Sequence, residues 1–410
     1  MPRVRPLLVA LLTLSLVVAA AGPSVLAATG TAAESSAPGP LISPDDQTPN
    51  VLGVETERAG FGSPNLSVTR TLRMQQSSVT RELTRRTLER RLAVAPNESV
   101  REQVLLNATA RLDDRSATLR AEAETAKQAF RRGELTATQY AARLATVHSR
   151  ATDLLALTTF VSRQAEEPTV TRRAARIRAS LVLLTGPVRS SVAERVRGRA
   201  ADVRVYAGVG ESGTALATVS GGEYVRAASR PAFLVPSQPG IPDGLAMLDY
   251  ARQLYPWAMN NSDNFGANAQ LLSPYAYQID IHHRQGRTVS YVGSTGGVFH
   301  EEQRLRLSRL PVERDFAVTT NNTTLAVDRT YAGGPLYVNV TNATGAPLDA
   351  EITVANETVG RTGADGHLWT LSPAGTYVVT AQVDGVRVNT TVSATDPAAS
   401  LGARTSAAEP

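Results

Sequence analysis

The chain contains no cysteine in its 410 residues. Disulfides, cysteine-ligated zinc, thiol catalysis and a lipid-modified N-terminal cysteine are therefore excluded, and packed cores must hold the domains together. Aromatic residues are scarce at 5%, and Lys127 is the only lysine, so nearly all positive charge is guanidinium. The formal net charge of +5, from 42 basic and 37 acidic residues, is too small to indicate nucleic-acid binding.

Long apolar runs are scarce too, and the longest, Leu7–Ala21, lies near the N-terminus behind Arg3 and Arg5. A Gly-Pro pair ends it, and residues 25–27 place small side chains at the −3 and −1 positions of a cleavage site. This is the arrangement of a secretory signal, so we expect residues 1–27 to be a signal peptide removed on export. The run is shorter than the roughly 20 residues of a membrane-spanning helix, which disfavours the alternative of an uncleaved anchor.

No second apolar run of that length follows in the sequence. We therefore expect an extracellular or cell-surface protein with no transmembrane segment in its mature chain. Asn-X-Ser/Thr triplets support export, because they are acceptors for N-glycosylation, and half of them cluster between Asn321 and Asn356. The ten candidates are Asn65, Asn97, Asn107, Asn260, Asn321, Asn322, Asn339, Asn342, Asn356 and Asn389.

Residues 28–71 are rich in small and turn-forming residues without periodicity, which predicts a flexible linker. Residues 72–199 then show helical patterning, which predicts a helical hairpin or bundle. One stripe repeats every seven residues, at Leu105, Leu112, Leu119 and Ala126.

A second stripe follows a capping box formed by Thr136 and Gln139. The short turn at Gly133 between the two stripes predicts an antiparallel pair of helices. Pro96 and Pro168 separate an earlier and a later helix from this pair. Three or four helices can bury their stripes within one chain, and the alternative is a homomeric coiled coil.

The remaining sequence is rich in strand patterns. Residues 200–314 combine alternating apolar and polar runs with one helical stretch, which predicts an α+β module. Short strands between Gly, Pro and Asp turns predict a β-sandwich over residues 315–395, followed by a disordered tail at 396–410. The predicted fold class is therefore multi-domain α+β, with an N-terminal helical hairpin or bundle, an α+β middle module and a C-terminal immunoglobulin-like or fibronectin III-like β-sandwich.

The turn motifs of this last region carry a family resemblance. Gly-Ala-Pro-Leu-Asp-Ala at 345–350, Asp-Gly at 365–366 and Gly-Thr-Tyr-Val-Val at 375–379 resemble carboxypeptidase-regulatory-like and fibronectin type III-like modules. The resemblance implies a spacer or adhesion unit with no catalytic residues. With the signal peptide, single lysine and sequons, the chain is similar to uncharacterised secreted haloarchaeal surface proteins, although it lacks their strong acidic excess.

Metal-ligand residue types crowd at one predicted hairpin. Adjacent side chains on a strand point to opposite faces, so His282 and His283 do not share one ion, and no third ligand follows at a suitable spacing. The sequence favours a solvated polar face there, and we predict no metal, no cofactor and no catalytic residue. The residues concerned are Asp280, His282, His283, His300, Glu301 and Glu302.

Two short motifs mimic known sites. Residues 208–213 match the glycine pattern of a dinucleotide loop, but the segment that follows is too short and too β-like for the helix this fold requires. Residues 293–296 lack the spacing of a nucleophile elbow. We therefore interpret the first as a hairpin loop and find no motif for acyl transfer.

Arginines such as Arg85, Arg86 and Arg90 concentrate in the helical region, where they could contact acidic headgroups or glycans. Interspersed acids favour a solvated helix face instead. The function we predict is a secreted, glycosylated cell-surface protein with a non-catalytic structural or interaction role in the envelope. Its helical region would bind an envelope protein or self-associate. The alternative is a module that binds an extracellular peptide or polysaccharide, and an extracellular hydrolase is third.

Overall fold

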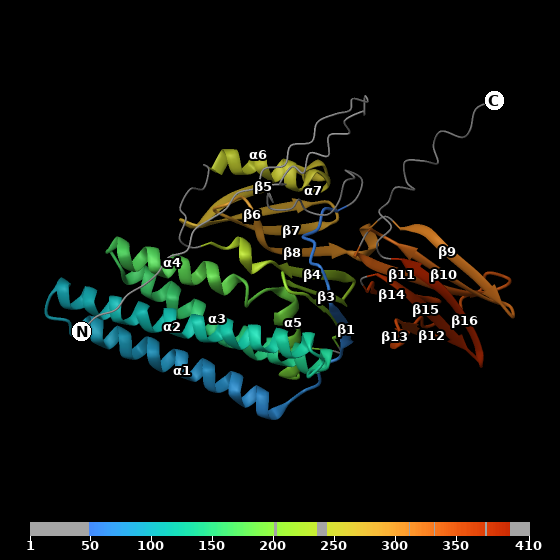
Figure 1. Ribbon diagram of the computed structural model, residues 1–410, viewed down its shortest axis with the longest axis horizontal. Helices are drawn as coiled ribbons and strands as arrows, with labels where there is room; N and C mark the ends of the chain where they lie inside the picture. Colours follow the sequence, from blue (N-terminus) through green and yellow to red (C-terminus); the bar gives the residue numbers. More distant parts are fainter. Residues whose placement is uncertain are drawn as a thin grey trace, which may run out of the picture. The chain divides into compact units, whose positions relative to one another are not determined.

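The structure is a computed structural model, and it describes residues 49–200, 203–235, 244–310, 312–331, 333–373 and 375–393 (Figure 1). The predicted signal peptide, most of the predicted linker before residue 49 and the predicted tail lie outside these residues. The described part is a multi-domain α+β fold.

Five helices build the region where sequence periodicity is helical. Side-chain caps at Ser67, Asn97 and Thr136 begin the first three, and the expected capping box with Gln139 is formed. Proline at the first turn begins the last two, where its missing N–H costs no hydrogen bond. The helices are α1 (Val68–Ala93), α2 (Glu98–Arg131), α3 (Ala137–Gln164), α4 (Pro168–Val182) and α5 (Pro187–Val196).

Helices α2 and α3 form the antiparallel pair expected from their stripes. Gly133, at φ 83°, adopts the left-handed conformation that ends α2 and lets the chain reverse. Early α2 lies beside late α3, where Arg101 hydrogen-bonds Gln164 at 3.3 Å. The seven-residue stripe is buried against α3 and α4 of the same chain, so it is not available for a coiled coil with a second copy.

The central element is an eight-stranded antiparallel sheet whose strand order is β1-β2-β3-β4-β8-β7-β6-β5. Helices α6 (Gly244–Leu254) and α7 (Pro256–Asn260) cover one face of its β5–β8 half, and α4 lies on the other face (Figure 1). Its strands are β1 (Arg58–Gly62), β2 (Val205–Val209), β3 (Thr214–Ser220), β4 (Glu223–Ser229), β5 (Ser262–Ser273), β6 (Ala276–His283), β7 (Gly286–Gly293) and β8 (Val298–Arg306).

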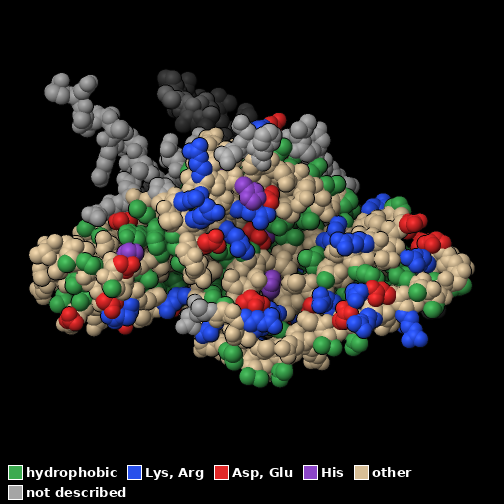
Figure 2. All heavy atoms as spheres, turned by 180° about the vertical axis from the view of Figure 1, so that it is seen from behind, with side chains coloured by type: hydrophobic (Ala, Val, Ile, Leu, Met, Phe, Trp, Pro, Cys, Tyr) green, Lys and Arg blue, Asp and Glu red, His purple; other side chains and the backbone are tan. Residues whose placement is uncertain are grey.

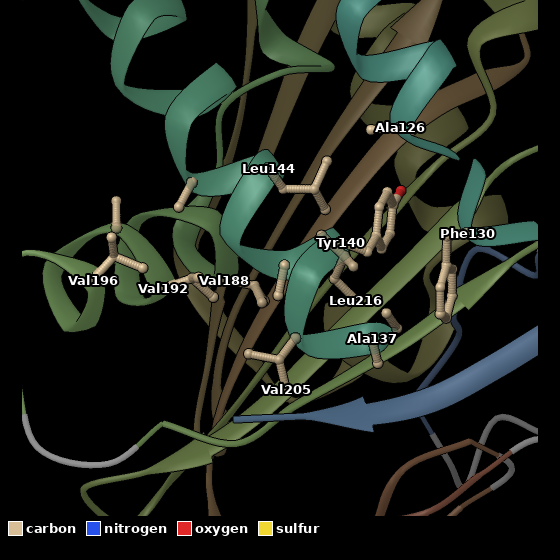
Figure 3. Close-up of a cluster of buried hydrophobic side chains, with 14 of the residues drawn as sticks. Ala126, Phe130, Ala137, Tyr140, Leu144, Val188, Val192, Val196, Val205 and Leu216 are labelled. Carbon is tan, nitrogen blue, oxygen red and sulfur yellow. The ribbon is translucent and has the colours of Figure 1, made fainter. Parts of the chain in front are cut away.

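The helices and this sheet share one hydrophobic core. Phe130 and Tyr140 stack at 4.9 Å between ring centroids, and Leu144 and Val192 pack with Leu216 of β3 (Figure 3). The helical region and the middle module, which sequence analysis separates at residues 199 and 200, are therefore continuous in their packing.

Residues 49–71 differ from the flexible linker expected there. Val51 and Leu52 are buried, and β1 pairs with β2 from Arg58 opposite Val209 onwards. Gly62 ends the strand against α3, where a Cβ atom would lie 2.7 Å from the backbone carbon of Ala137. The small residues that suggest flexibility in the sequence instead allow this close approach.

The C-terminal region is a β-sandwich, as predicted, joined to the central sheet by a short 3-10 turn at Leu307–Arg309; a second such turn, Pro231–Phe233, follows β4. Two four-stranded sheets, β14-β11-β10-β9 and β13-β12-β15-β16, enclose a core of aliphatic residues. The strands are β9 (Glu313–Thr320), β10 (Thr323–Arg329), β11 (Pro335–Asn342), β12 (Glu351–Val354), β13 (Glu357–Arg361), β14 (His367–Leu371), β15 (Thr376–Val383) and β16 (Val386–Ser393).

Candidate interaction surface on the helical region

Helix α1 carries apolar residues on two opposite faces. Met74, Leu88 and Leu92 are buried against the rest of the bundle. At about 100° of rotation per residue, a second apolar group falls within roughly 60° on the opposite side of the helix. This outer stripe consists of Val68, Leu72, Val79 and Leu83, which are 66%, 59%, 59% and 61% exposed. A helix at the surface of a bundle needs only the one apolar face that packs on its neighbours. Packing within the chain therefore does not account for the outer stripe, which marks a candidate interaction surface.

A groove runs between α1 and α2, with α3 as its floor. Three overlapping hollows of about 590, 550 and 310 Å³ form it, and they share lining residues such as Arg73, Thr118 and Arg115. Leu119, Leu154 and Leu157 lie along the groove. Leu83 of the outer stripe lines its far end, so stripe and groove are one continuous surface.

The groove has a large excess of positive charge. Eight arginines line it, against the two carboxylates of Glu122 and Asp153. Both carboxylates are already engaged, the first by Arg150 and the second by Arg81 at 3.3 Å. The other six arginines make no ion pair with any carboxylate in the described part of the chain: Arg70, Arg73, Arg91, Arg111, Arg115 and Arg143.

Elsewhere on α1 the arginines do form the solvated face expected from the sequence. Arg85 and Arg86 both bind Glu82, at 2.8 Å, one turn away on the same helix. Figure 2 shows basic and acidic side chains intermixed over the face drawn there. The periodicity of α1 alone does not separate these paired arginines from the unpaired ones, because the groove needs α2 and α3 for its other walls.

The histidine pair on β6 divides between the two sides of the strand, as the strand geometry predicts. The His282 side chain is 64% exposed and lies 3.4 Å from Asp280, which Arg287 also binds. His283 is buried beside Trp257, and burial lowers its pKa to about 4. Within the described ranges, no group of three or more His, Asp or Glu residues has the geometry to hold a metal ion.

The acidic and histidine residues of β8 also divide by strand alternation. His300 faces Ser229 at 2.8 Å and Glu302 at 3.2 Å on the side of α4 and α5. Glu301 points to the other side, where it is fully buried. Glu301 therefore does not share a site with His300 and Glu302.

Glu301 belongs to a buried polar network that sequence analysis missed. Its carboxylate accepts hydrogen bonds from Arg226 at 3.1 Å, Tyr255 at 2.9 Å and the backbone N–H of Leu52 at 2.9 Å. Arg226 also donates to the carbonyl of Leu52 at 2.8 Å. Burial raises the pKa of Glu301, and Arg226 opposes that shift. The network thus fastens the segment before β1 to the sheet.

The two short motifs lie in turns. Residues 210–213 connect β2 to β3 as a hairpin, where Gly210 N–H donates to the Gly213 carbonyl at 3.1 Å. Residues 293–296 connect β7 to β8. His148 lies half-buried on α3, and burial lowers its pKa to about 4.

All ten sequon asparagines lie within the described residues, and none is buried. Asn339 and Asn342 are half-buried and the other eight are exposed. Asn321 and Asn322 form the turn between β9 and β10, and Asn356 lies in the turn between β12 and β13. Asn97 uses its side-chain oxygen to cap α2.

The fold defines a multi-domain α+β protein with a C-terminal fibronectin III-like β-sandwich, and comparison with known families agrees. Residues 314–390 match an archaeal fibronectin-III type-like domain. Residues 205–311 match a family of unknown function, DUF7094, and residues 1–201 match a domain of unknown function, DUF7096. No curated protein and no solved structure matches the chain. In the described part, none of the helices has the length and apolar character needed to cross a membrane.

Proposed function

We propose that this chain is an exported, N-glycosylated cell-surface protein with a non-catalytic interaction role in the envelope. Its helical region binds another envelope protein through the outer stripe of α1 and the adjoining groove. The observation that carries the proposal is the exposed stripe Val68, Leu72, Val79 and Leu83 on the side of α1 opposite its buried face. An amphipathic partner that covers these side chains gains the free energy of burying apolar surface.

The charge of α1 selects the chemistry of the partner. The helix contains seven arginines and two glutamates. A second copy of α1 would place like charges together, which costs free energy and specificity. An acidic amphipathic helix places its apolar face on the stripe and its carboxylates near the unpaired arginines of the groove, such as Arg111 and Arg115. The partner is therefore an acidic helical segment of a different protein.

Export is supported by the N-terminal signal pattern and by ten sequons, of which eight have an exposed asparagine. The domain family that residues 314–390 match is archaeal, which is consistent with the haloarchaeal origin that we propose. The sandwich then serves as a spacer that presents glycans.

Photo-crosslinking in native cells tests this function. A photoreactive residue replaces Leu72 or Leu83 in the stripe, and Ala117, exposed on α2, is the matched control. Cells are separated into medium, envelope and cytoplasm, and crosslinked partners are identified by mass spectrometry. The expected result is an envelope protein captured by both stripe positions and not by the control.

Three results would count against the proposal. Crosslinks between two copies of this chain would replace the acidic partner with self-association. Recovery as an uncrosslinked monomer in the medium would remove the envelope role. Recovery in the cytoplasm without modification would overturn export itself.

A further inference from the structure

Three ring side chains form a row on the outer face of the β14-β11-β10-β9 sheet. Tyr337 of β11 lies between His367 and Trp369 of β14, with ring centroids 5.5 Å and 5.0 Å apart. All three are half-exposed. The alternate β11 residues Leu336 and Val338 point inward to the sandwich core, so the row belongs to the opposite face.

Asn339 stands at the open end of this row. It follows Tyr337 by two residues, which places both side chains on the same face about 7 Å apart along the strand. Its cross-strand neighbour on β14 is His367. Asn339 is half-buried, makes no hydrogen bond through its side chain within the described residues, and forms a sequon with Thr341.

The other sequons lack such surroundings. Asn321, Asn322 and Asn356 lie in turns, and Asn389 on β16 lies opposite Thr380. Within the described chain, Asn339 is the sequon with ring side chains both two residues earlier on its strand and directly across from it. The arrangement is a shallow surface of two rings, tilted by 35° to one another, beside an acceptor amide.

We propose that Asn339 is glycosylated and that its first sugar lies on the surface formed by Tyr337 and His367. The apolar C–H face of a sugar packs on the aromatic face of Tyr337, whose hydroxyl remains available to the sugar hydroxyls. Both ring nitrogens of His367 are already engaged by Asp365, Nδ1 at 3.2 Å from its carbonyl and Nε2 at 3.1 Å from its carboxylate, and these contacts hold the imidazole in place beside Tyr337. In the modification, Nδ2 of Asn339 bonds to the anomeric carbon of a lipid-phosphate-activated sugar. The bond from that carbon to the phosphate oxygen breaks, and one amide proton leaves with the lipid phosphate.

This inference rests on the export that the proposed function assumes, because Asn-X-Ser/Thr sequons are glycosylation acceptors in secreted proteins. It adds a specific acceptor, Asn339, and a specific contact surface for the first sugar. A glycan held flat on the sheet covers Tyr337 from water, whereas a glycan at an exposed turn extends into solvent.

Hydroxyl-radical footprinting of the full-length protein purified from native cells tests whether the first sugar covers Tyr337. Oxidation of Tyr337 is measured by mass spectrometry in the wild-type protein, in Asn339→Gln and in Thr341→Ala. The two variants remove the same sequon through different residues, so a shared effect cannot come from either side chain alone. Asn389→Gln removes a sequon on the other sheet and is the control.

The expected result is full or partial glycan occupancy at Asn339, with several-fold slower Tyr337 oxidation in the wild type and the control than in the two sequon variants. Glycans at other sequons but none at Asn339 would overturn this inference and leave the proposed function standing. If Asn339 is glycosylated but Tyr337 oxidation is equal in all four proteins, the claim that the first sugar packs on Tyr337 is wrong. A chain without any glycan would contradict the glycosylation in the proposed function itself.

Discussion

Arg226 and Glu301 form an ion pair with 3.1 Å between Nη1 and Oε1, and the Glu301 side chain has no exposed surface. Between them they bind both the N–H and the carbonyl of Leu52, a residue 249 positions before Glu301 in the chain. The pair therefore holds the N-terminal segment on the face of the sheet.

Replacing Glu301 with Leu should lower the free energy of unfolding by about 3–5 kcal/mol, because it leaves Arg226 as a buried charge without its partner. Urea unfolding measures this change. The double variant Arg226→Met/Glu301→Leu should recover most of the loss, since no isolated charge then remains. Glu134→Gln, which breaks the exposed pair with Arg132, is the control and should have no measurable effect. Equal losses in the single and double variants would show that the contacts with Leu52, rather than the ion pair, carry the stability.

The buried His283 should make stability depend on pH. Its pKa falls from an ordinary value of 6.5 to about 4 because burial disfavours the charged imidazole, with Gln285 opposing and His282 reinforcing the shift. Between these two values the unfolded chain binds a proton that the folded chain does not. The contribution of His283 to stability is thus complete above about pH 6.5 and falls by about 3 kcal/mol as the pH drops to 4.

Urea unfolding across this pH range measures the effect. His283→Asn should flatten the wild-type slope by about one proton, since the variant has no imidazole to titrate at this position. Gln278→Asn is the control on the same strand, and it should leave the slope unchanged because it removes no titratable group. Equal slopes of the unfolding free energy against pH in all three proteins would show that protonation of the His283 imidazole does not lower stability.

The sequence predicts those structural features that depend on residues close together in the chain. The stripes of α2 and α3, the turn at Gly133 and the capping box at Thr136 are all set within a few residues, and each is found in the structure. The β-sandwich is predictable for the same reason, because its strands follow one another through short turns.

Contacts between segments far apart in the chain leave no comparable pattern in the sequence. Strand β1 has no alternating pattern, yet it pairs with β2 across the whole helical region. Glu301 resembles a solvated acid in sequence, and only the register that places it opposite Ala228 and near Tyr255 shows that it is buried. The unpaired arginines of the groove become distinguishable only when three helices bring them together.

Substitution on the two faces of α1 should separate binding from folding. The triple variant Leu72→Ser/Val79→Ser/Leu83→Ser should leave the free energy of unfolding nearly unchanged, because these side chains are exposed. It should abolish capture of the envelope partner. Leu88→Ala, on the buried face, should instead cost about 2–5 kcal/mol in urea unfolding. Retained capture by the triple variant would show that the stripe is not the binding surface.

The unpaired arginines should make the groove selective for acidic ligands. A short poly-L-glutamate peptide with a fluorescent label should bind the full-length protein, with an affinity that falls as salt rises, since exposed charges are screened. Arg111→Gln/Arg115→Gln should weaken binding by roughly 5- to 10-fold, as expected for two partly solvated charge pairs. Arg120→Gln, exposed on the same helix but outside the groove, should bind as the wild type does. Fluorescence anisotropy gives the dissociation constants, and an equal loss in both variants would mean that net charge, not the groove, attracts the peptide.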